Sequence, residues 1–441
     1  MKRNNRILLI SACFSIFVLS ATTLIAQDKT TEELKLSIQL RPRAEIRNGL
    51  FTPILKGQKP GAFISQRSRL GLTYSKTPYL KMGLSTQVVS TWGNDAQVQT
   101  TANDISLYEA WAQLFFSKEW NLKLGRQILS YDDERILGAL DWNNAGRKHD
   151  AALLGFEKNK LKANAGFAFN QNSEKTTGTY YDNQVSQPYK SMEFLWLRYD
   201  INPSLAFSLL GLNLGFQDRI DSSRSNLQTL GGNVFLKKNK FAATGTYYYQ
   251  TGINHSNNTI LKSTNAWMAA LKFDYNFNPS FSTSIGSDYL SGNNMHSTST
   301  QNTYFNPLYA TGHKFYGSMD YFYVSSPHNN TGLWDSYINL NFKPTEKFTG
   351  QIAFHHFGST GEVVDYSGEN APKSLGNEAD LSLGYTIMND VKITGGYAQM
   401  FTDKSMKYVK NIPPVSEMKS VQNWVWVSIN INPQIILKSN Q

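Results

Sequence analysis

The chain has 441 residues, of which 13% are aromatic and only 17% are charged, and its formal net charge is +10. This length allows two or three soluble domains or one large β-barrel, and the basic excess fits nucleic acid, acidic lipid or a polyanionic substrate. The only cysteine, Cys13, lies in a segment that we expect to be removed, which excludes disulfides, thiol catalysis and cysteine-bound metal from the mature protein.

The first 26 residues have the features of a secretory signal. Three basic residues among the first six precede an apolar run from residue 7 to residue 19, and small residues follow up to Ala26. We expect cleavage after Ala26, so that 1–26 is the signal peptide and 27–441 is one barrel domain. A lipoprotein leader cleaved before Cys13 is disfavoured, because the apolar run continues well past that residue.

Arginines alternate along the next two strand-like segments. They are Arg41, Arg43, Arg47, Arg67 and Arg69. The neighbouring positions of opposite parity carry Ile38, Leu40, Leu70 and Leu72. Alternate residues of a strand point to opposite faces, so this pattern gives a sheet with one cationic and one apolar side. A soluble core cannot bury so many unpaired charges, whereas the inner face of a membrane barrel is hydrated, so we predict a water-filled pore for anions.

The most distinctive segment of the chain, between residues 124 and 150, mixes arginines with carboxylates. The arginines of this segment are Arg126, Arg135 and Arg147. The carboxylates among them are Asp132, Asp133, Glu134, Asp141 and Asp150. Two interpretations are open. The segment is either a solvated outer loop whose ion pairs contribute under about 1 kcal/mol each, or a loop folded into the lumen that pairs its own charges and offers the surplus to a ligand.

Alternation of apolar and polar residues with a period of two recurs along the rest of the chain. It is cleanest in the segments 161–170, 195–201, 267–277 and 378–387. A helix would instead show apolar spacings of three and four, so these segments are predicted strands of a half-solvated sheet. Tyr247-Tyr248-Tyr249 could stack on bases or sugars, but packing in the barrel wall is the favoured interpretation.

The predicted connections alternate between short and long. Short turns are expected at 76–78, 117–119, 158–159, 202–204, 238–239, 278–280, 344–346 and 389–390. Long polar loops are expected at 48–62, 90–103, 128–148, 170–190, 217–225, 251–263, 291–333, 358–376 and 402–419. These connections separate eighteen strands and leave both chain ends on the short-turn side, as in outer-membrane barrels with tight periplasmic turns and long extracellular loops.

The last predicted strand is 422–431, where Trp424 and Trp426 suit an interfacial aromatic girdle. The chain then continues through Asn432-Pro433 to Gln441, unlike the many outer-membrane barrels that end on an aromatic residue. A soluble propeller would show a repeat of about forty to fifty residues, and a multi-domain sandwich would need a linker; neither is visible. We therefore predict an all-β fold, a large closed antiparallel transmembrane β-barrel in the outer membrane of a Gram-negative bacterium.

The sequence resembles the alginate-export family of outer-membrane porins. The resemblance rests on Gly125-Arg126-Gln127, Asp132-Asp133-Glu134-Arg135, Asp141-Trp142, Arg147 and Asp150, with support from Tyr108-Glu109-Ala110-Trp111 and from 305–309 and 312–317. It implies a monomeric eighteen-stranded barrel whose arginine-lined constriction selects an anionic polysaccharide. It further implies that Arg126, Arg135 and Arg147 form a selectivity filter, with Asp132, Asp133 and Glu134 as their partners.

We thus expect a porin or exporter for an alginate-like polyuronate, in contact with outer-membrane lipid. The predicted pore-lining residues are Arg41, Arg43, Arg67, Arg69, Arg126, Arg135, Arg147 and Arg198. The predicted arginine partners are Glu109, Asp132, Asp133, Glu134 and Asp150. Arginine suits this role because its planar fork makes two charge-assisted hydrogen bonds to a carboxylate. Any single arginine could equally support the wall by pairing with Glu45, Glu109 or Asp200.

Other functions are weaker alternatives. A broad porin for small anions belongs to the same class. An outer-membrane enzyme would need a nucleophile and a base on one wall, whereas His255, His296, His313 and His328 lie in predicted loops without such an arrangement. His355 and His356 are adjacent on a strand and point to opposite faces, so they do not suggest a metal site. We expect no cofactor, no metal and no nucleic-acid partner, since no phosphate-binding glycine loop is present.

Overall fold

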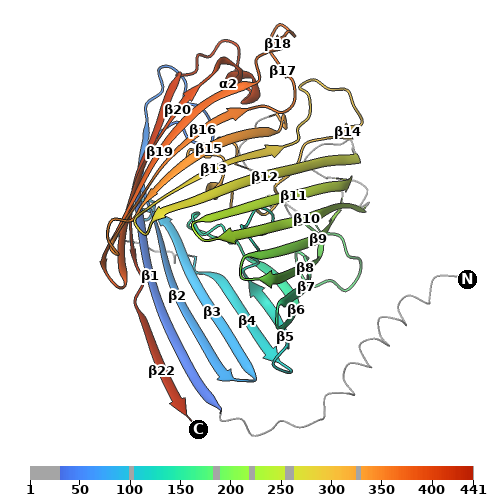
Figure 1. Ribbon diagram of the computed structural model, residues 1–441, viewed down its shortest axis with the longest axis vertical. Helices are drawn as coiled ribbons and strands as arrows, with labels where there is room; N and C mark the ends of the chain where they lie inside the picture. Colours follow the sequence, from blue (N-terminus) through green and yellow to red (C-terminus); the bar gives the residue numbers. More distant parts are fainter. Residues whose placement is uncertain are drawn as a thin grey trace, which may run out of the picture.

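The part of the chain that the structure describes forms a large closed β-barrel with almost no helix (Figure 1). The computed structural model describes residues 30–98, 104–181, 189–217, 224–253, 263–323 and 329–440. The predicted signal peptide, 1–26, lies outside these residues, as do His255 and His328. Among the residues described, no helix is long and apolar enough to cross a membrane.

Eighteen strands close the barrel, which confirms the predicted strand number. The first nine are β1 Thr31–Asn48, β2 Gly61–Thr77, β3 Leu80–Thr91, β4 Ser106–Phe115, β5 Trp120–Gln127, β6 His149–Lys158, β7 Leu161–Phe169, β8 Ser191–Asn202 and β9 Leu205–Gln217. The others are β10 Arg224–Lys238, β11 Phe241–Ile253, β12 Ser263–Asn278, β13 Phe281–Leu290, β15 Leu333–Phe342, β16 Phe348–Gly358, β19 Ser374–Met388, β20 Val391–Thr402 and β21 Val421–Ile431. Short elements are β14 Gln301–Asn302, η1 Gly312–Lys314, β17 Val363–Val364, β18 Asn370–Ala371, α2 Lys404–Val409 and β22 Gln434–Asn440.

The first and last strands close the ring. Each barrel strand pairs antiparallel with the next one, and β21 pairs with the second half of β1, where Ser428 lies opposite Arg43. The chain beyond Pro433 continues the same strand, because β22 pairs with the first half of β1. The carbonyl of Pro433 accepts a hydrogen bond from the amide of Ile38 at 3.2 Å, so the proline lies within the seam without ending it. The sequence beyond residue 431 therefore completes the wall.

The short turns follow from their sequences. Every predicted short turn falls between two consecutive strands at one end of the barrel. Both Asn-Pro-Ser turns use the asparagine side chain in the same way: the Asn202 carboxamide accepts from the Ser204 amide at 2.8 Å, and that of Asn278 accepts from Ser280 at 2.9 Å. Asn159 adopts a left-handed φ of 54°, which two-residue hairpins require. The long loops lie at the other end, and several of them extend partly beyond the described residues.

The two faces of the wall differ as predicted. Side chains such as Ile38, Leu70 and Ile285 point outward and remain about half exposed, as is expected of residues that contact lipid. Arg67 lies on the same strand as Leu70 but has the opposite parity, so it points inward, and it is 1% exposed. The alternation in each strand thus separates an apolar outer surface from a polar lumen.

Two loops fold into the lumen. Lumen loop A (residues 128–148) and lumen loop B (residues 303–323) join through backbone hydrogen bonds, from Gly138 N to Tyr309 O at 2.9 Å and from Tyr309 N to Ile136 O at 3.0 Å. Side chains such as Leu137 and Phe305 are fully buried between them. The loops contact inward residues on β1, β2, β8, β11, β13, β19 and β21. They therefore cross the lumen and narrow the passage.

A candidate anion site in the lumen

Four inward arginines form the arginine cluster, which comprises Arg41 and Arg43 on β1 and Arg67 and Arg69 on β2. The register of the two strands places Arg41 directly opposite Arg67. Like charges at opposed positions of a sheet repel each other, so this arrangement needs an anion to stabilise it.

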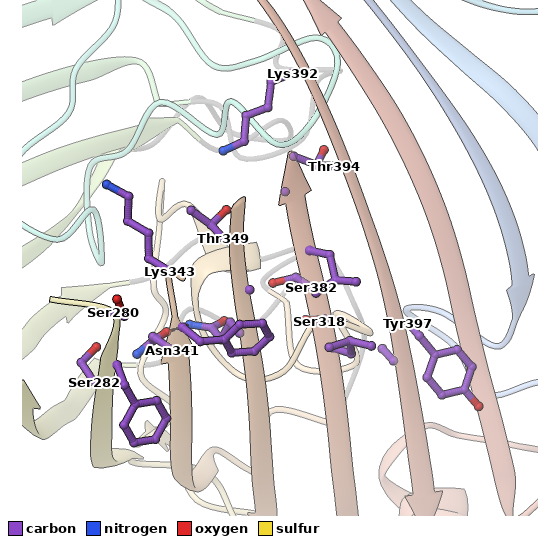
Figure 2. A pocket seen from close by; sticks show the side chains of 18 of the residues that line it. Ser280, Ser282, Ser318, Asn341, Lys343, Thr349, Ser382, Lys392, Thr394 and Tyr397 are labelled. Carbon is purple, nitrogen blue, oxygen red and sulfur yellow. Dashed lines mark hydrogen bonds between the residues drawn. The ribbon is translucent and has the colours of Figure 1, made fainter. Parts of the chain in front are cut away.

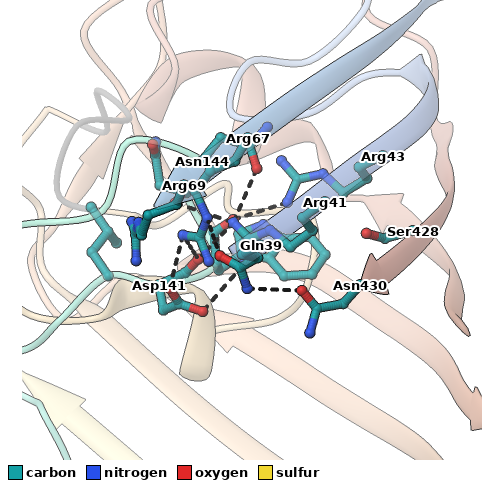
Figure 3. A network of polar contacts seen from close by, with 12 residues as sticks. Gln39, Arg41, Arg43, Arg67, Arg69, Asp141, Asn144, Ser428 and Asn430 are labelled. Carbon is teal, nitrogen blue, oxygen red and sulfur yellow. Dashed lines mark hydrogen bonds and ion pairs between the residues drawn. The ribbon is translucent and has the colours of Figure 1, made fainter. Parts of the chain in front are cut away.

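Lumen loop A supplies that anion through Asp141 (Figure 3). One oxygen of its carboxylate, Oδ1, accepts from Arg67 Nη1 at 2.8 Å, and the other, Oδ2, accepts from Arg41 Nη1 at 3.2 Å. Arg41 Nη2 also donates to the Asp141 carbonyl at 2.9 Å. Burial alone would raise the pKa of the Asp141 carboxyl, but the charges and hydrogen bonds of Arg67 and Arg41 outweigh it and hold that pKa below its ordinary value. The carboxylate therefore stays charged and bridges two arginines.

The exposure of these groups is unequal. The side chain of Asp141 is 60% exposed, whereas those of Arg67 and Arg41 are 1% and 12% exposed. The carboxylate thus faces the open lumen while the guanidinium groups are held from behind. Arg67 Nε donates to Gln39 Oε1 at 2.9 Å, which fixes its orientation independently of Asp141. Arg41 and Arg67 thus form a preorganised carboxylate-binding site, which Asp141 of lumen loop A occupies.

A second carboxylate, that of Glu45, pairs with Arg43 of the cluster and with Arg47 further along β1. It accepts from Arg43 Nε at 2.8 Å and from Arg47 Nη2 at 2.8 Å, and its other partner is the indole N–H of Trp424 at 3.0 Å. Arg43 also lies over the ring of Trp142 at 4.2 Å and donates to the Trp142 carbonyl at 2.9 Å. Arg43 is therefore fully engaged by the wall and by lumen loop A.

Arg69 differs from the other members. It donates twice to Gln87 Oε1, at 2.7 and 3.1 Å, and stacks over Tyr108 at 3.5 Å. It pairs with no carboxylate within the described part of the chain. A cavity of about 260 Å³ adjoins it, lined among others by Arg67, Arg69, Gln39, Ser85, Trp111 and Asp141. Glu109 also lines this cavity without pairing with Arg69, so that among the described residues the four arginines of the cluster pair only with Asp141 and Glu45.

Arg126 does not join this lumen cluster. It pairs with Asp150 through two hydrogen bonds of 2.9 and 2.8 Å, as predicted for that carboxylate. However, Arg126 has the strand parity of Leu124, which faces outward, and lies at the long-loop end of β5. Its neighbour Gln127, of the opposite parity, is the buried one. We therefore place Arg126 at the outer rim and leave it out of the pore-lining set.

Arg135 and Arg147 hold the lumen loops in place. Arg135 is buried; its Nε pairs with Asp133 at 2.7 Å, and its other nitrogens pair with Asp288 on β13, one of them at 3.2 Å. Arg147 donates to the carbonyls of Tyr309 and Ala310, at 2.9 Å for Ala310. The side chain of Arg135 is 5% exposed, and Arg147 is partly buried. Arg135 and Arg147 therefore anchor lumen loop A, to the wall and to lumen loop B respectively.

Arg198 and the remaining predicted partners occupy other places. Arg198 points inward on β8 near the short-turn end, and pairs with Asp200 at 3.1 Å. Glu109 accepts from Trp111 at 3.1 Å, Asp132 accepts from Trp196 at 3.0 Å, and Glu134 pairs with Lys314. Among the described residues, no arginine pairs with Glu109, Asp132 or Glu134, because lysine and tryptophan donors of the lumen lie closer.

His355 and His356 point to opposite sides of the wall, as predicted. His355 faces the lumen and its Nδ1 lies 2.9 Å from Asp335. His356, of the opposite parity, contacts Asn377 at 2.9 Å. His313, expected in a loop, lies in lumen loop B, where it stacks on Trp142 at 4.2 Å and bonds to Asp320.

Comparison with known proteins gives one family and one fold. The profile of a family described as "Alginate export" matches residues 34–401. Among solved structures, Acinetobacter baumannii OccAB4 has a TM-score of 0.60 and 13% identity, covering 92% of this chain and 99% of its own. The outer membrane protein OpdK from Pseudomonas aeruginosa has a TM-score of 0.57 and 11% identity, with 91% and 99% covered. Pseudomonas aeruginosa OpdO has a TM-score of 0.58 and 12% identity, covering 93% of this chain and 98% of its own. A search of curated sequences found no match.

Proposed function

Since this chain belongs to the alginate-export family and is an outer-membrane β-barrel porin, we propose that it passes an anionic polysaccharide through its arginine-lined lumen. The residues that we assign to this passage are Arg41, Arg67 and Arg69, with Arg198 nearer the short-turn end and Arg43 as a support. No covalent chemistry is part of the proposal.

The bridged carboxylate of Asp141 carries this proposal. A uronate polymer presents one carboxylate per sugar, and each of these can take the position that Asp141 occupies between Arg41 and Arg67. The positive surplus of the cluster raises the local concentration of anions and repels cations. Each new carboxylate of the polymer competes with the one already bound, so that no single contact holds the chain permanently.

The passage also requires release. Selective conduction needs sites that are strong enough to admit the ligand and weak enough to let it leave. Asp141 meets this need because it is a tethered competitor that returns to Arg41 and Arg67 once a ligand carboxylate departs. Arg198, paired with the exposed Asp200, offers a further exchangeable site near the short turns.

A second candidate is a porin for small anions. The fold neighbour OpdK has been solved with vanillate, a small carboxylate. The two lumen loops narrow the passage here, which favours small solutes if the loops stay in place. Both candidates use the same arginines and differ in the length of the ligand.

The test is the reversal potential of the purified protein in a planar bilayer under a potassium chloride gradient, with and without polyuronate. We expect anion preference, block by polyuronate, and loss of both in the double variant R41Q/R67Q. R126Q is the matched control, because it removes the same side chain from the outer rim and should keep the wild-type selectivity. A wild-type channel that is unselective or prefers cations would refute the proposal, and selectivity without block would favour the small-anion porin.

A further inference from the structure

A second region of the lumen carries short uncharged polar side chains. A cavity of about 530 Å³ lies against β12, β13, β15, β16, β19 and β20 near the short turns (Figure 2). The inward residues that line it are Asn276, Ser282, Asn341, Thr349, Gln351, Ser382 and Thr394. We call these seven residues the polar wall. Strand parity puts all of them on the lumen face, whereas Tyr397, which also borders the cavity, points away from it.

Several hydroxyl groups of the polar wall have no protein partner. In the described residues, Ser282, Ser382 and Thr394 form no side-chain hydrogen bond, and the one bond within the wall runs from Gln351 Nε2 to Asn341 Oδ1 at 2.8 Å. Each free hydroxyl can both donate and accept. They therefore keep their hydrogen-bonding capacity for water or for a ligand.

Most of the buried charge lies away from the polar wall. Asp288 and Glu378, on the same strands, lie nearer the long loops and are covered by the lumen loops. Asp274 on β12 is partly exposed, and it pairs with Lys272 at 2.9 Å. Two cations flank the cavity, Lys343 and Lys392; Lys343 pairs with the exposed Glu346 at 2.6 Å. An acidic ligand thus meets lysines and hydroxyls here, and the carboxylate of Asp274 beside the wall is paired with Lys272.

An aromatic contact joins this cavity to the arginine cluster. Trp426 lines the cavity, and Trp142 packs edge-on against it at 4.8 Å. Trp142 in turn supports Arg43 at 4.2 Å and is followed along lumen loop A by residues whose carbonyls bind Arg41. The cavity and the arginine cluster are therefore joined by the contact between Trp426 and Trp142.

We infer that the polar wall is a second binding site of the proposed passage, and that it binds the hydroxyl groups of the polysaccharide. Sugar hydroxyls replace water at Ser282, Ser382 and Thr394 without leaving these groups unsatisfied, and Trp426 offers a surface to the C–H face of a pyranose ring. An aromatic or aliphatic carboxylate would cover the same hydroxyls with apolar atoms, which is costly. This inference rests on the proposed anion passage and adds the chemistry that selects among anions.

The experiment compares two blockers with the same number of carboxylates, an oligouronate and an oligoglutamate, added on the side that the short turns face. The wild-type channel should bind the oligouronate more tightly. In the variant S282A/S382A/T394V this preference should fall about tenfold, since three hydrogen bonds of modest net strength are lost. Anion selectivity in potassium chloride should not change, because the three substitutions alter no charge.

The control is T283V/S336A, which removes hydroxyls from the outward face of β13 and β15 and should keep the preference. If the triple variant fails to assemble, S382A alone should show the same change at smaller size. Equal binding of the two blockers by the wild-type channel, or an unchanged preference in the triple variant, would overturn the inference. A wild-type channel without anion preference would instead overturn the proposed function itself.

Discussion

Replacement of Asp141 by asparagine should open the arginine site to external anions. The change removes a charge that contacts Arg67 at 2.8 Å and Arg41 at 3.2 Å, while it keeps the shape of the side chain. Hydrogen bonds to charged groups contribute about 1.5–3 kcal/mol each when buried. Because the Asp141 side chain is 60% exposed, we discount this to about 1–2 kcal/mol in total, which corresponds to roughly a 5- to 30-fold change in an equilibrium constant.

The D141N channel should bind polyuronate more tightly than the wild-type channel does. In D141N, polyuronate no longer competes with a tethered carboxylate, so its blocking concentration should fall by about that factor, and anion preference in a salt gradient should rise. The assay is single-channel recording with increasing polyuronate, with R126Q as a control that alters a charge pair outside the lumen. Weaker block or lower anion preference in D141N would refute the view that Asp141 occupies the ligand site.

Three further predictions concern the anchoring of this architecture. R135A should leave Asp288 buried without its cation, at a cost of about 3–5 kcal/mol, and limited proteolysis should then cleave lumen loop A while the strands stay resistant; an uncleaved loop would contradict the anchoring role. The lowered pKa of Asp141 means that its pairing is present above the ordinary carboxyl pKa and is lost only as pH falls through the lowered value. Conductance should therefore be constant from pH 7 to pH 5, and a rise within this window would count against the ion pairs. Deletion of residues 434–440 should leave the first half of β1 with unpaired backbone groups at the seam. The barrel should then unfold at a lower temperature, as measured by the change in its electrophoretic mobility on heating. An unchanged unfolding temperature would show that β22 does not stabilise closure.

The barrel wall was predictable because its signals are local. Alternation along segments such as 161–170 and 267–277 reports which face each residue occupies, and the Asn-Pro-Ser turns fix where strands end. The outward position of Arg126 was also visible, since it shares the parity of Leu122 and Leu124. The expectation that Arg126 belongs to a selectivity filter rested on the family motif alone.

The site itself depends on contacts that no local pattern reveals. Asp141 lies 100 residues beyond Arg41 in the chain, and Asp288 lies 153 residues beyond Arg135. Nothing in the sequence around Arg135 distinguishes a filter residue from an anchor. Only the path of lumen loop A into the barrel decides it, and that path is set by packing between distant elements such as Leu137 and Tyr309.

The position of the arginine cluster at the seam has a consequence for biogenesis. Gln39 Nε2 donates to Asn430 Oδ1 at 2.8 Å, and Glu45 accepts from both Arg43 and Trp424, so the first and last strands must meet before the site is complete. A polypeptide arrested before this meeting would hold its guanidinium groups without their final supports. On the proposed function, charge discrimination would be acquired in the closing step of insertion, when the last strand pairs with the first.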